Sequence, residues 1–375
     1  MANVANLSIV RSDPAGAAIE VAGLSHIYAG REGGVPALTD ISLSVGAGRF
    51  VVIVGPSGCG KTSLLMMMAG LRHQTSGTIH VQGKPIDAPD PDRVGVVFQE
   101  ASLFPWLSAL DNIEFPLALR HAPREERRAR ATEMLNLVGL QGFGARYPHE
   151  LSGGMKQRVS IARGLVQDPP VLLMDEPFAA LDEQTRMTMG DELLRIWAAT
   201  GKTVVFVTHD IDEAVKLGDR VAVFRVGGKL AQYDEPGVLL TRPADDFVDS
   251  FVGRDRGYRG LSFRSSERLP LHELRAVLSG ERTEEGWTLV LDADGRPLGW
   301  HLDRHGGATA DATDLVPGGS LYDAGTGSLR SALDAALSSP SGLGVAVDGD
   351  GRAVGSVAAD DVLEALAAAR RAEAA

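Results

Sequence analysis

The stretch Gly55-Pro56-Ser57-Gly58-Cys59-Gly60-Lys61-Thr62 has the pattern GxxxxGK[ST], which is typical of a phosphate-binding loop. It follows the apolar run Phe50–Val54 and opens a helical pattern over Thr62–Leu71, which is the context such a loop requires. Glycines let the backbone N–H groups turn inward and surround phosphate oxygens at the N-terminus of a helix. We therefore expect Lys61 to neutralise the β- and γ-phosphates of a nucleoside triphosphate, and Thr62 to bind Mg²⁺.

Two adjacent carboxylates, Asp175 and Glu176, follow a second apolar run, Val171–Met174. Four apolar residues predict a buried strand, and open α/β sheets bind ligands at the carboxyl ends of their strands. Together with the phosphate loop, this placement predicts that Asp175 belongs to the Mg²⁺ shell and that Glu176 polarises an attacking water. The two clusters favour hydrolysis of a nucleoside triphosphate.

The composition sets broad limits on the class of protein. The chain has 375 residues, of which 44% are apolar and 23% charged, and a formal net charge of −12. This predicts packed globular domains and argues against a protein that coats nucleic acid. No stretch approaches the roughly 18 apolar residues that span a bilayer, and the N-terminus is a poor secretion signal. Cys59 is the only cysteine, so no intrachain disulfide can form. Its small size explains its place in the loop better than redox chemistry does. We expect a soluble cytoplasmic protein.

The candidate site residues lie between predicted strands and helices that alternate along the chain. Residues 1–18 are polar and rich in alanine and glycine, and we expect them to be flexible. Residues 19–253 alternate β-branched apolar runs with helical patterns, which predicts a largely parallel sheet covered by helices. The expected strands are Phe50–Val54, Val94–Gln99, Val171–Met174, Thr203–Thr208 and Arg220–Arg225. Helices are expected over Pro123–Leu140 and Glu150–Val166.

The amino-acid composition changes after Gly253, since lysine is absent from there to the end of the chain. We expect a linker at 254–262 and a small second domain at 263–375. Within it, Asp292–Gly299 is echoed by Asp348–Gly355, 56 residues later. Each copy follows an apolar run and contains an Asp-Gly turn, which predicts two β-hairpins and two copies of one α/β unit. The glycine comes too early for an EF-hand calcium loop.

Beyond these clusters, the chain resembles the ATP-binding-cassette (ABC) superfamily. Leu151-Ser152-Gly153-Gly154-Met155-Lys156-Gln157 is similar to the ABC signature sequence, with Met155 where many members have glutamine. Ala180-Leu181-Asp182 resembles the D-loop, Gln99 the glutamine of the Q-loop, and His209 the switch histidine. Tyr28 matches the aromatic residue that stacks on adenine.

The resemblance implies an α/β P-loop NTPase cassette, built on a mixed sheet with a helical subdomain, that binds ATP and Mg²⁺. It implies that Glu176, His209, Lys61 and Gln99 are catalytic and that Thr62, Gln99 and Asp175 hold Mg²⁺. It also implies a head-to-tail homodimer, in which the signature helix of one subunit completes the phosphate site of the other. The implied ATP-binding residues are Tyr28, Gly55, Ser57, Gly58, Cys59, Gly60, Lys61, Thr62, Ser63, Ser152, Gly153, Gly154 and Asp182.

The family also implies partners in a membrane. The segment Glu100–Pro116 carries Phe104 and Trp106, and in the family this region receives the coupling helix of a permease subunit. Pro105 and Pro116 favour an irregular surface segment over ordinary core packing. The resemblance implies an importer ATPase at the cytoplasmic face of the membrane, with permease subunits and a substrate-binding protein as partners. Non-transport ABC ATPases in DNA repair carry a long coiled-coil insertion, and those in translation usually carry two cassettes. This sequence shows neither feature, which argues against that class.

The chain resembles two importer families that transport different solutes. Leu103-Phe104-Pro105-Trp106 and the signature region resemble nitrate, sulfonate and taurine uptake ATPases. Thr208–Arg220 and Phe251–Gly257 resemble the osmoprotectant ATPases for glycine betaine, choline and carnitine. Ser328–Ala367 is similar to a CBS module, and the hairpin at Leu289–Gly299 would be a degenerate first copy. A tandem CBS-like regulatory domain at 263–375 favours the osmoprotectant group. An inert, dimer-stabilising tail is the alternative to a sensor.

Overall fold

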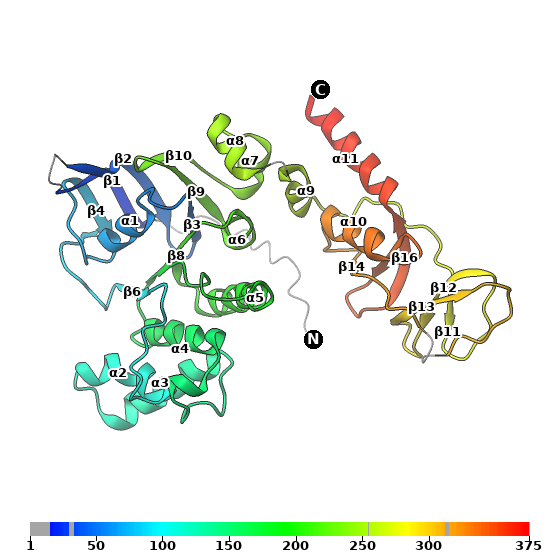
Figure 1. Cartoon of the computed structure of the whole chain (residues 1–375), viewed down its shortest axis with the longest axis horizontal. Helices are drawn as coiled ribbons and strands as arrows, with labels where there is room; N and C mark the ends of the chain where they lie inside the picture. Colours follow the sequence, from blue (N-terminus) through cyan, green and yellow to red (C-terminus); the bar gives the residue numbers. More distant parts are fainter. Residues whose placement is uncertain (1–15, 30–33, 254, 312–314, 375) are drawn as a thin grey trace. The chain divides into compact units, whose positions relative to one another are not determined.

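The computed structural model describes residues 16–29, 34–253, 255–311 and 315–374. The chain divides into two compact units at Gly253 and Arg254, and each is described by itself (Figure 1). Residues 1–15, where we expected most of a flexible N-terminus, lie outside the described residues. The first strand begins at Ala17, two residues before the boundary expected from the sequence.

The first unit is built on a six-stranded sheet with the order β10-β9-β3-β8-β7-β6. Neighbouring strands from β9 to β6 are parallel, and β10 pairs antiparallel with β9, so the sheet is mixed. Three strands have the bounds expected from the sequence, and the other two differ by one or two residues. The strands are β3 (Phe50–Val54), β6 (Val94–Val97), β7 (Val171–Asp175), β8 (Thr203–Thr208), β9 (Arg220–Arg225) and β10 (Lys229–Asp234).

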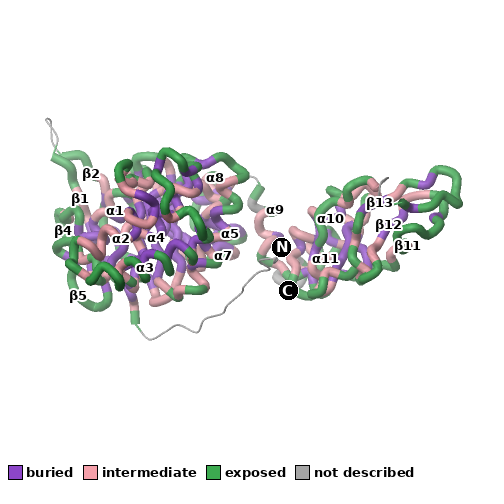
Figure 2. Tube along the Cα trace, turned by 90° about the horizontal axis from the view of Figure 1, so that it is seen from below, coloured by how far each residue is buried: buried purple, intermediate pink, exposed green. Residues whose placement is uncertain are grey.

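Both faces of this sheet are buried, which explains why its strands are continuous apolar runs rather than alternating ones. Successive side chains of a strand point to opposite faces. In β3, Phe50, Val52 and Val54 accordingly pack into one hydrophobic cluster, while Val51 and Ile53 pack into another. Figure 2 shows the buried residues gathered along the middle of this unit. The sheet is therefore a rigid base for the loops that follow the ends of its strands.

A second, antiparallel sheet covers one face, with the order β2-β1-β4-β5. Helix α1 (Lys61–Met68) packs between the two sheets, because Leu64, Leu65 and Met68 belong to the cluster shared with β1, β2 and β3. This packing brings β1 close to the start of α1. The strands of this sheet are β1 (Ala17–Tyr28), β2 (Val35–Gly46), β4 (Ser76–Val81) and β5 (Lys84–Pro85).

Helices cover the other face, and three of them, α2, α3 and α4, form a subdomain beyond the β6 edge (Figure 1). Pro116 lies inside α2, so the expectation of an irregular segment there is wrong. Packing of α2 against α3 and α4 holds the helix although proline removes one backbone N–H. The helices are α2 (Ala109–Leu119), α3 (Arg124–Leu137), η1 (Pro148–Glu150), α4 (Gly153–Leu165), α5 (Glu183–Thr200), α6 (Ile211–Leu217), α7 (Pro236–Thr241) and α8 (Asp246–Val252).

The second unit begins with helical turns in the segment 255–262, where we expected a linker. Leu261 is buried in the hydrophobic core of this unit, and that burial accounts for the ordered turns. Two three-stranded sheets follow, β11-β12-β13 and β14-β15-β16. The elements are α9 (Arg256–Gly260), η2 (Leu261–Phe263), β11 (Ala276–Leu278), β12 (Gly286–Leu291), β13 (Pro297–Asp303), β14 (Leu321–Asp323), α10 (Leu329–Ser338), β15 (Leu343–Val347), β16 (Ala353–Ala358) and α11 (Ala359–Ala374).

The two predicted hairpins are present and repeat each other in detail. In each sheet a short strand pairs parallel with the first strand of an antiparallel hairpin. Asp292 Oδ1 accepts hydrogen bonds from the backbone N–H groups of Asp294 and Arg296, and Asp348 Oδ1 does the same for Asp350 and Arg352. Helices accompany the second sheet, whereas no helix lies between β11 and β13. The first copy is thus the reduced one.

The two hairpins also contact each other inside this unit. The N–H of Ala353 donates to the carbonyl of Gly295 at 3.0 Å, and Arg296 Nε donates to the carbonyl of Asp350 at 3.2 Å. Leu289 and Trp300 of the first hairpin share a hydrophobic cluster with Val345 and Val347 of the second. The repeats therefore form one packed pair. Among the described residues of the whole chain, no helix combines the length and apolar character that a bilayer crossing needs.

Candidate functional site

The phosphate loop connects β3 to α1, at the carboxyl edge of the six-stranded sheet. Gly58 and Gly60 have φ angles of +77° and +95°, in the region that favours glycine. A Cβ on Gly60 would lie 2.3 Å from the carbonyl oxygen of Ala37, so glycine is also required by space. The loop is therefore shaped by its glycines to present N–H groups at the start of α1.

Lys61 is 95% buried, with 5% of its surface exposed, and its ammonium group sits inside the loop. Nζ donates hydrogen bonds to the carbonyls of Gly55 at 2.8 Å and Pro56 at 3.1 Å. It also lies 3.8 Å from Glu176 Oε1. A buried cation held by carbonyls and one carboxylate is placed to exchange these partners for phosphate oxygens.

Thr62 and Asp175 come together as the sequence suggested, although they are 113 residues apart. Thr62 Oγ1 donates to Asp175 Oδ1 at 3.0 Å. Burial raises the pKa of the Asp175 carboxyl, and the charge of Glu176 adds to the shift, while the Thr62 hydrogen bond opposes it. A hydroxyl and a buried carboxylate beside the phosphate loop are hard oxygen donors, so this pair fits Mg²⁺.

Glu176 and His209 are also joined directly. Glu176 Oε2 lies 3.0 Å from His209 Nδ1, where β7 and β8 end side by side in the sheet. Glu176 has a φ of +40°, which is uncommon for a residue other than glycine, and its N–H donates to the carbonyl of Val207 at 2.9 Å. Backbone strain of this kind is concentrated at functional sites. Here it accompanies a carboxylate shared between His209 and Lys61.

Gln99 is not brought into contact with this cluster. It follows β6, whose last residue, Val97, pairs with Met174 of β7, so Gln99 lies at the same edge of the sheet as Asp175. Its side chain is exposed and has no hydrogen-bond partner within the part of the chain that the structure describes. Gln99 therefore follows the strand next to the one that ends at Asp175, and no hydrogen bond within the described residues holds its amide there.

Tyr28 connects the antiparallel sheet to the phosphate-loop helix. Its hydroxyl lies 2.8 Å from Ser63 Oγ, and the Arg72 guanidinium lies 4.8 Å from the centre of its ring. His26 meets the ring edge-on, with ring centres 4.7 Å apart. Burial lowers the pKa of His26, and the nearby charge of Arg72 adds to the shift. Neither Arg72 nor His26 belongs to a motif, so sequence patterns could not predict their place beside Tyr28.

The signature residues and Asp182 lie apart from this cluster. Ser152 caps α4 and accepts a hydrogen bond from the N–H of Met155, and Asp182 caps α5 by accepting from the N–H of Thr185. Among the described residues, neither Ser152 nor Asp182 forms a hydrogen bond to the phosphate loop or to Asp175. Gly153 is exposed beside Ser152, and Gly154 is buried against Thr185 of α5. One chain therefore leaves the start of α4 free for another ligand.

Cys59 lies in the loop but is fully buried. Burial raises the pKa of its thiol, which keeps it protonated and unreactive. A Cβ on Gly55 would come within 2.9 Å of its sulfur, so Cys59 packs closely against the backbone of the loop. Cys59 therefore shapes the loop and supplies no nucleophile.

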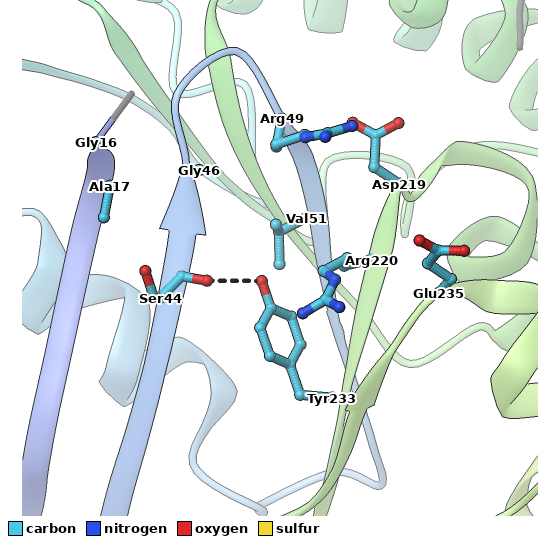
Figure 3. A pocket seen from close by; sticks show the side chains of 10 residues that line it. All are labelled: Gly16, Ala17, Ser44, Gly46, Arg49, Val51, Asp219, Arg220, Tyr233 and Glu235. Atoms are coloured by element: carbon cyan, nitrogen blue, oxygen red, sulfur yellow. Dashed lines mark hydrogen bonds between the residues drawn. The ribbon is translucent and has the colours of Figure 1, made fainter. Parts of the chain in front are cut away.

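A cavity of about 700 Å³ lies at the opposite edge of the sheet, near the amino ends of β3 and β9 (Figure 3). Arg220 stacks over the Tyr233 ring at 5.0 Å, and the Tyr233 hydroxyl donates to the carbonyl of Ser44 at 2.8 Å. None of the residues predicted for catalysis or nucleotide binding lines this cavity. The predicted catalytic and nucleotide-binding residues beside the phosphate loop lie at the carboxyl edge instead.

Comparisons with known proteins agree with this geometry. Residues 38–179 match the family described as ABC transporter. The nitrate import ATP-binding protein NrtD of Synechocystis sp. is 48% identical over 271 residues, which is 71% of this chain and 97% of that protein. The chain belongs to the ABC transporter ATP-binding proteins. This ABC protein is accordingly an ATPase that binds and hydrolyses ATP.

Two further similarities describe the extent of the match. The glycine betaine/carnitine/choline transport ATP-binding protein OpuCA of Bacillus subtilis is 41% identical over 238 residues, covering 62% of each chain. A solved structure, the dimeric post-hydrolysis state of the ATP-binding cassette MJ0796 bound to ADP and Pi, has a TM-score of 0.53 and 35% identity. It covers 58% of this chain and 98% of that one. The α/β cassette is thus established over about three-fifths of the ABC protein.

Proposed function

We propose that the ABC protein hydrolyses ATP with Glu176 as the residue that orients and polarises the attacking water. The 3.0 Å contact between Glu176 Oε2 and His209 Nδ1 carries this proposal, because it fixes the carboxylate beside Lys61 at the phosphate loop. His209 then contacts the γ-phosphate, and Lys61 leaves the carbonyls of Gly55 and Pro56 for the β- and γ-phosphates. The work of the protein is positioning and charge stabilisation.

Thr62, Asp175 and Gln99 are proposed to hold Mg²⁺, which neutralises charge on the β- and γ-phosphates when it is bound. Asp175 and Thr62 already form a paired oxygen site, and Gln99 follows the adjacent strand. Tyr28 is proposed to stack on adenine, since its ring is 37% exposed and its hydroxyl lies on Ser63 at the loop helix. The remaining proposed nucleotide contacts are Gly55, Ser57, Gly58, Cys59, Gly60 and Ser63.

The active form is proposed to be a homodimer in which Ser152, Gly153, Gly154 and Asp182 of one copy approach the ATP of the other. The separation of these residues from their own phosphate loop supports this, as does the dimeric state of the similar solved cassette. Sedimentation of a Glu176→Gln variant with and without ATP tests it. A dimer that forms with ATP supports the proposal, and a monomer at saturating ATP contradicts it.

The ABC protein is further proposed to power an importer at the cytoplasmic face of the membrane, docked on permease subunits that work with a substrate-binding protein. Trp106 is 70% exposed, on a loop pinned by the buried Asn112. The Asn112 amide accepts from the N–H of Phe104 and donates to the carbonyls of Phe104, Leu107 and Ser108. A rigid loop that exposes a large aromatic side chain is suited to receive a partner helix.

Quaternary-amine osmoprotectants, such as glycine betaine, choline and carnitine, are the proposed solutes. The name of OpuCA refers to these solutes, and 62% of its own length is matched, so OpuCA and this chain each have a long region outside the match. The nitrate-type relative lacks such a region, since 97% of it is matched. The packed pair of hairpins in the second unit supports a tandem CBS-like regulatory domain, which we propose as a sensor of ionic strength or of an adenine nucleotide.

A nitrate, sulfonate or taurine importer is the second candidate, favoured by the higher identity of 48% to the nitrate import protein. Uptake of labelled glycine betaine, taurine and nitrate by cells with and without the gene separates the two. Betaine uptake that depends on the gene and rises with osmolarity supports the osmoprotectant importer and the sensing domain. Gene-dependent taurine or nitrate uptake that ignores osmolarity overturns both.

A further inference from the structure

Arg186, on the second turn of α5, contacts two loops that no sequence motif links. Its Nη2 donates to the carbonyl of Leu181 at 3.3 Å, inside the segment Ala180-Leu181-Asp182. Its Nη1 donates to Asp210 Oδ2 at 3.3 Å, and its Nε lies 3.6 Å from Glu213 Oε1. One guanidinium thus joins the start of α5 to the segment that begins directly after His209.

Asp210 and Glu213, the carboxylates that contact Arg186, also form hydrogen bonds with the residues on both sides of His209. Asp210 Oδ1 accepts from the N–H groups of Asp212 and Glu213, which caps α6. Thr208 Oγ1 donates to Glu213 Oε2 at 2.6 Å and accepts from the N–H of Asp210 at 3.0 Å. His209 is therefore held between two residues of one hydrogen-bonded network, and its ring reaches Glu176.

The charges of this network make Arg186 its central group. Glu213 is 13% exposed at its side chain and Asp210 is 27% exposed, so two negative groups share a largely enclosed space. Burial raises the pKa of Glu213, and the charge of Asp210 adds to the shift, while Arg186 opposes it. Without the guanidinium, two close carboxylates would repel each other beside the residue that must contact the γ-phosphate.

We propose that Arg186 is a positioning residue that couples the segment Ala180–Asp182 to His209. When that segment shifts, Arg186 transmits the shift to Asp210 and Glu213, and so to the placement of His209 against Glu176. This inference rests on the proposed function, because it assumes that His209 and Glu176 act on the γ-phosphate. It adds a route by which the loop expected to face the other subunit controls hydrolysis within one chain.

Arginine is suited to this task where lysine is not. Its planar fork reaches a carbonyl and two carboxylates at once, whereas an ammonium group acts as a point charge. Lys216 provides a matched control, because it also bridges α5 and α6, with Nζ donating to the carbonyl of Met187 at 3.2 Å and paired with Asp191 at 2.7 Å. Among the described residues, Lys216 forms no hydrogen bond or ion pair with Leu181, Asp210 or Glu213.

The experiment measures steady-state ATPase kinetics of the full chain for Arg186→Ala, Arg186→Lys and Lys216→Ala. We expect Arg186→Ala to lower kcat by about 10- to 100-fold with KM for ATP nearly unchanged, since misplacing a reacting group by about 1 Å costs on the order of 100-fold. Arg186→Lys should recover part of the loss, and Lys216→Ala should leave kcat within about twofold. An unchanged kcat in Arg186→Ala, or an equal loss in Lys216→Ala, overturns the inference.

A double-substitution cycle keeps the test informative should Arg186→Ala fold poorly. Glu213→Gln removes one of the paired charges, and its combination with Arg186→Lys should be less harmful than the sum of the two single changes. Additive losses contradict the network. Glu176→Gln and His209→Ala are measured in parallel: wild-type turnover in these variants would refute the proposed function itself. Their inactivity beside a normal Arg186→Ala would refute the further inference alone.

Discussion

Glu176 and His209 are 33 residues apart in the chain, and a 3.0 Å contact between Oε2 and Nδ1 joins them at the ends of adjacent strands. The pairing of β7 with β8 brings the two side chains together, so the sheet itself organises this contact. Preorganised groups cost no rearrangement when the reaction occurs. Lys61, 3.8 Å away on the other carboxylate oxygen, extends this arrangement to the phosphate loop.

Glu176→Gln should still bind ATP but hydrolyse it about 100- to 1,000-fold more slowly, because the amide cannot accept a proton from water. The amide retains the size of the side chain and its contact with His209, so the fold should be unaffected. Nucleotide affinity is measured by fluorescence titration and turnover by phosphate release. Turnover at the wild-type rate would remove Glu176 from its proposed role.

Tyr28→Ala should weaken ATP binding about 5- to 150-fold, since stacking of a base on an aromatic ring contributes about 1–3 kcal/mol. Binding of inorganic tripolyphosphate should not change, because the phosphate loop is untouched. Tyr28→Phe keeps the ring and loses only the bond to Ser63, which makes it the matched control. Calorimetry with both ligands decides the matter: equal losses for ATP and tripolyphosphate would show a structural effect instead of base stacking.

Trp106→Ala should leave the ATPase activity of the isolated protein intact and reduce its assembly with the permease. The side chain is 70% exposed, so little folding energy depends on it. Val226, which is 72% exposed, is a comparable apolar side chain outside this loop, and Val226→Ala should assemble normally. Co-purification from membranes and solute uptake report the result. Normal assembly of Trp106→Ala would place the docking surface elsewhere.

Asp303 should make the stability of the second unit depend on pH. Its carboxylate accepts bonds from the N–H groups of His305, Gly306 and Ala308 and from the Thr283 hydroxyl. These bonds hold the pKa of Asp303 well below its usual value of 3.8. Because the folded-state pKa is lowered, the stabilisation is present above about pH 4 and is lost as the pH falls further.

Hydrogen exchange in residues 286–303 of the full chain checks this at pH 7, 4 and 3. Asp303→Asn should exchange faster than the wild type at pH 7, since its amide N–H₂ meets backbone donors, and the difference should shrink at pH 3. Asp294→Asn is the control, because Asp294 is exposed in the hairpin turn. Equal protection of the two variants at pH 7 would contradict the prediction.

Local patterns in the sequence were enough to predict the elements that carry the site. The five parallel strands are continuous apolar runs because both of their faces are buried, and this pattern can be recognised in a sequence without the structure. The phosphate loop was predictable because glycine is required at Gly58 and Gly60 by their positive φ angles. The two hairpins were predictable because Asp292 and Asp348 each close the same turn.

Other features depended on contacts that no local pattern encodes. Pro116 lies inside α2 because that helix packs against α3 and α4, and the segment expected to be a linker is helical because Leu261 is buried. Gln99 lies at the expected edge of the sheet, with no hydrogen-bond partner in the part of the chain that the structure describes. Arg186 belongs to no motif, and its role follows from three elements meeting around one guanidinium.

From the sequence alone we could predict the groups that carry the chemistry: a phosphate loop, two carboxylates, a histidine and a signature helix, in the order of the ABC family. Which of these groups meet depends on the folded structure. It joined Thr62 to Asp175, Glu176 to His209 and Tyr28 to Ser63, and it left Ser152 at a separate helix end. The reason is physical, because residue types and φ preferences are local properties, whereas the distance between two side chains depends on how strands far apart in the chain pair.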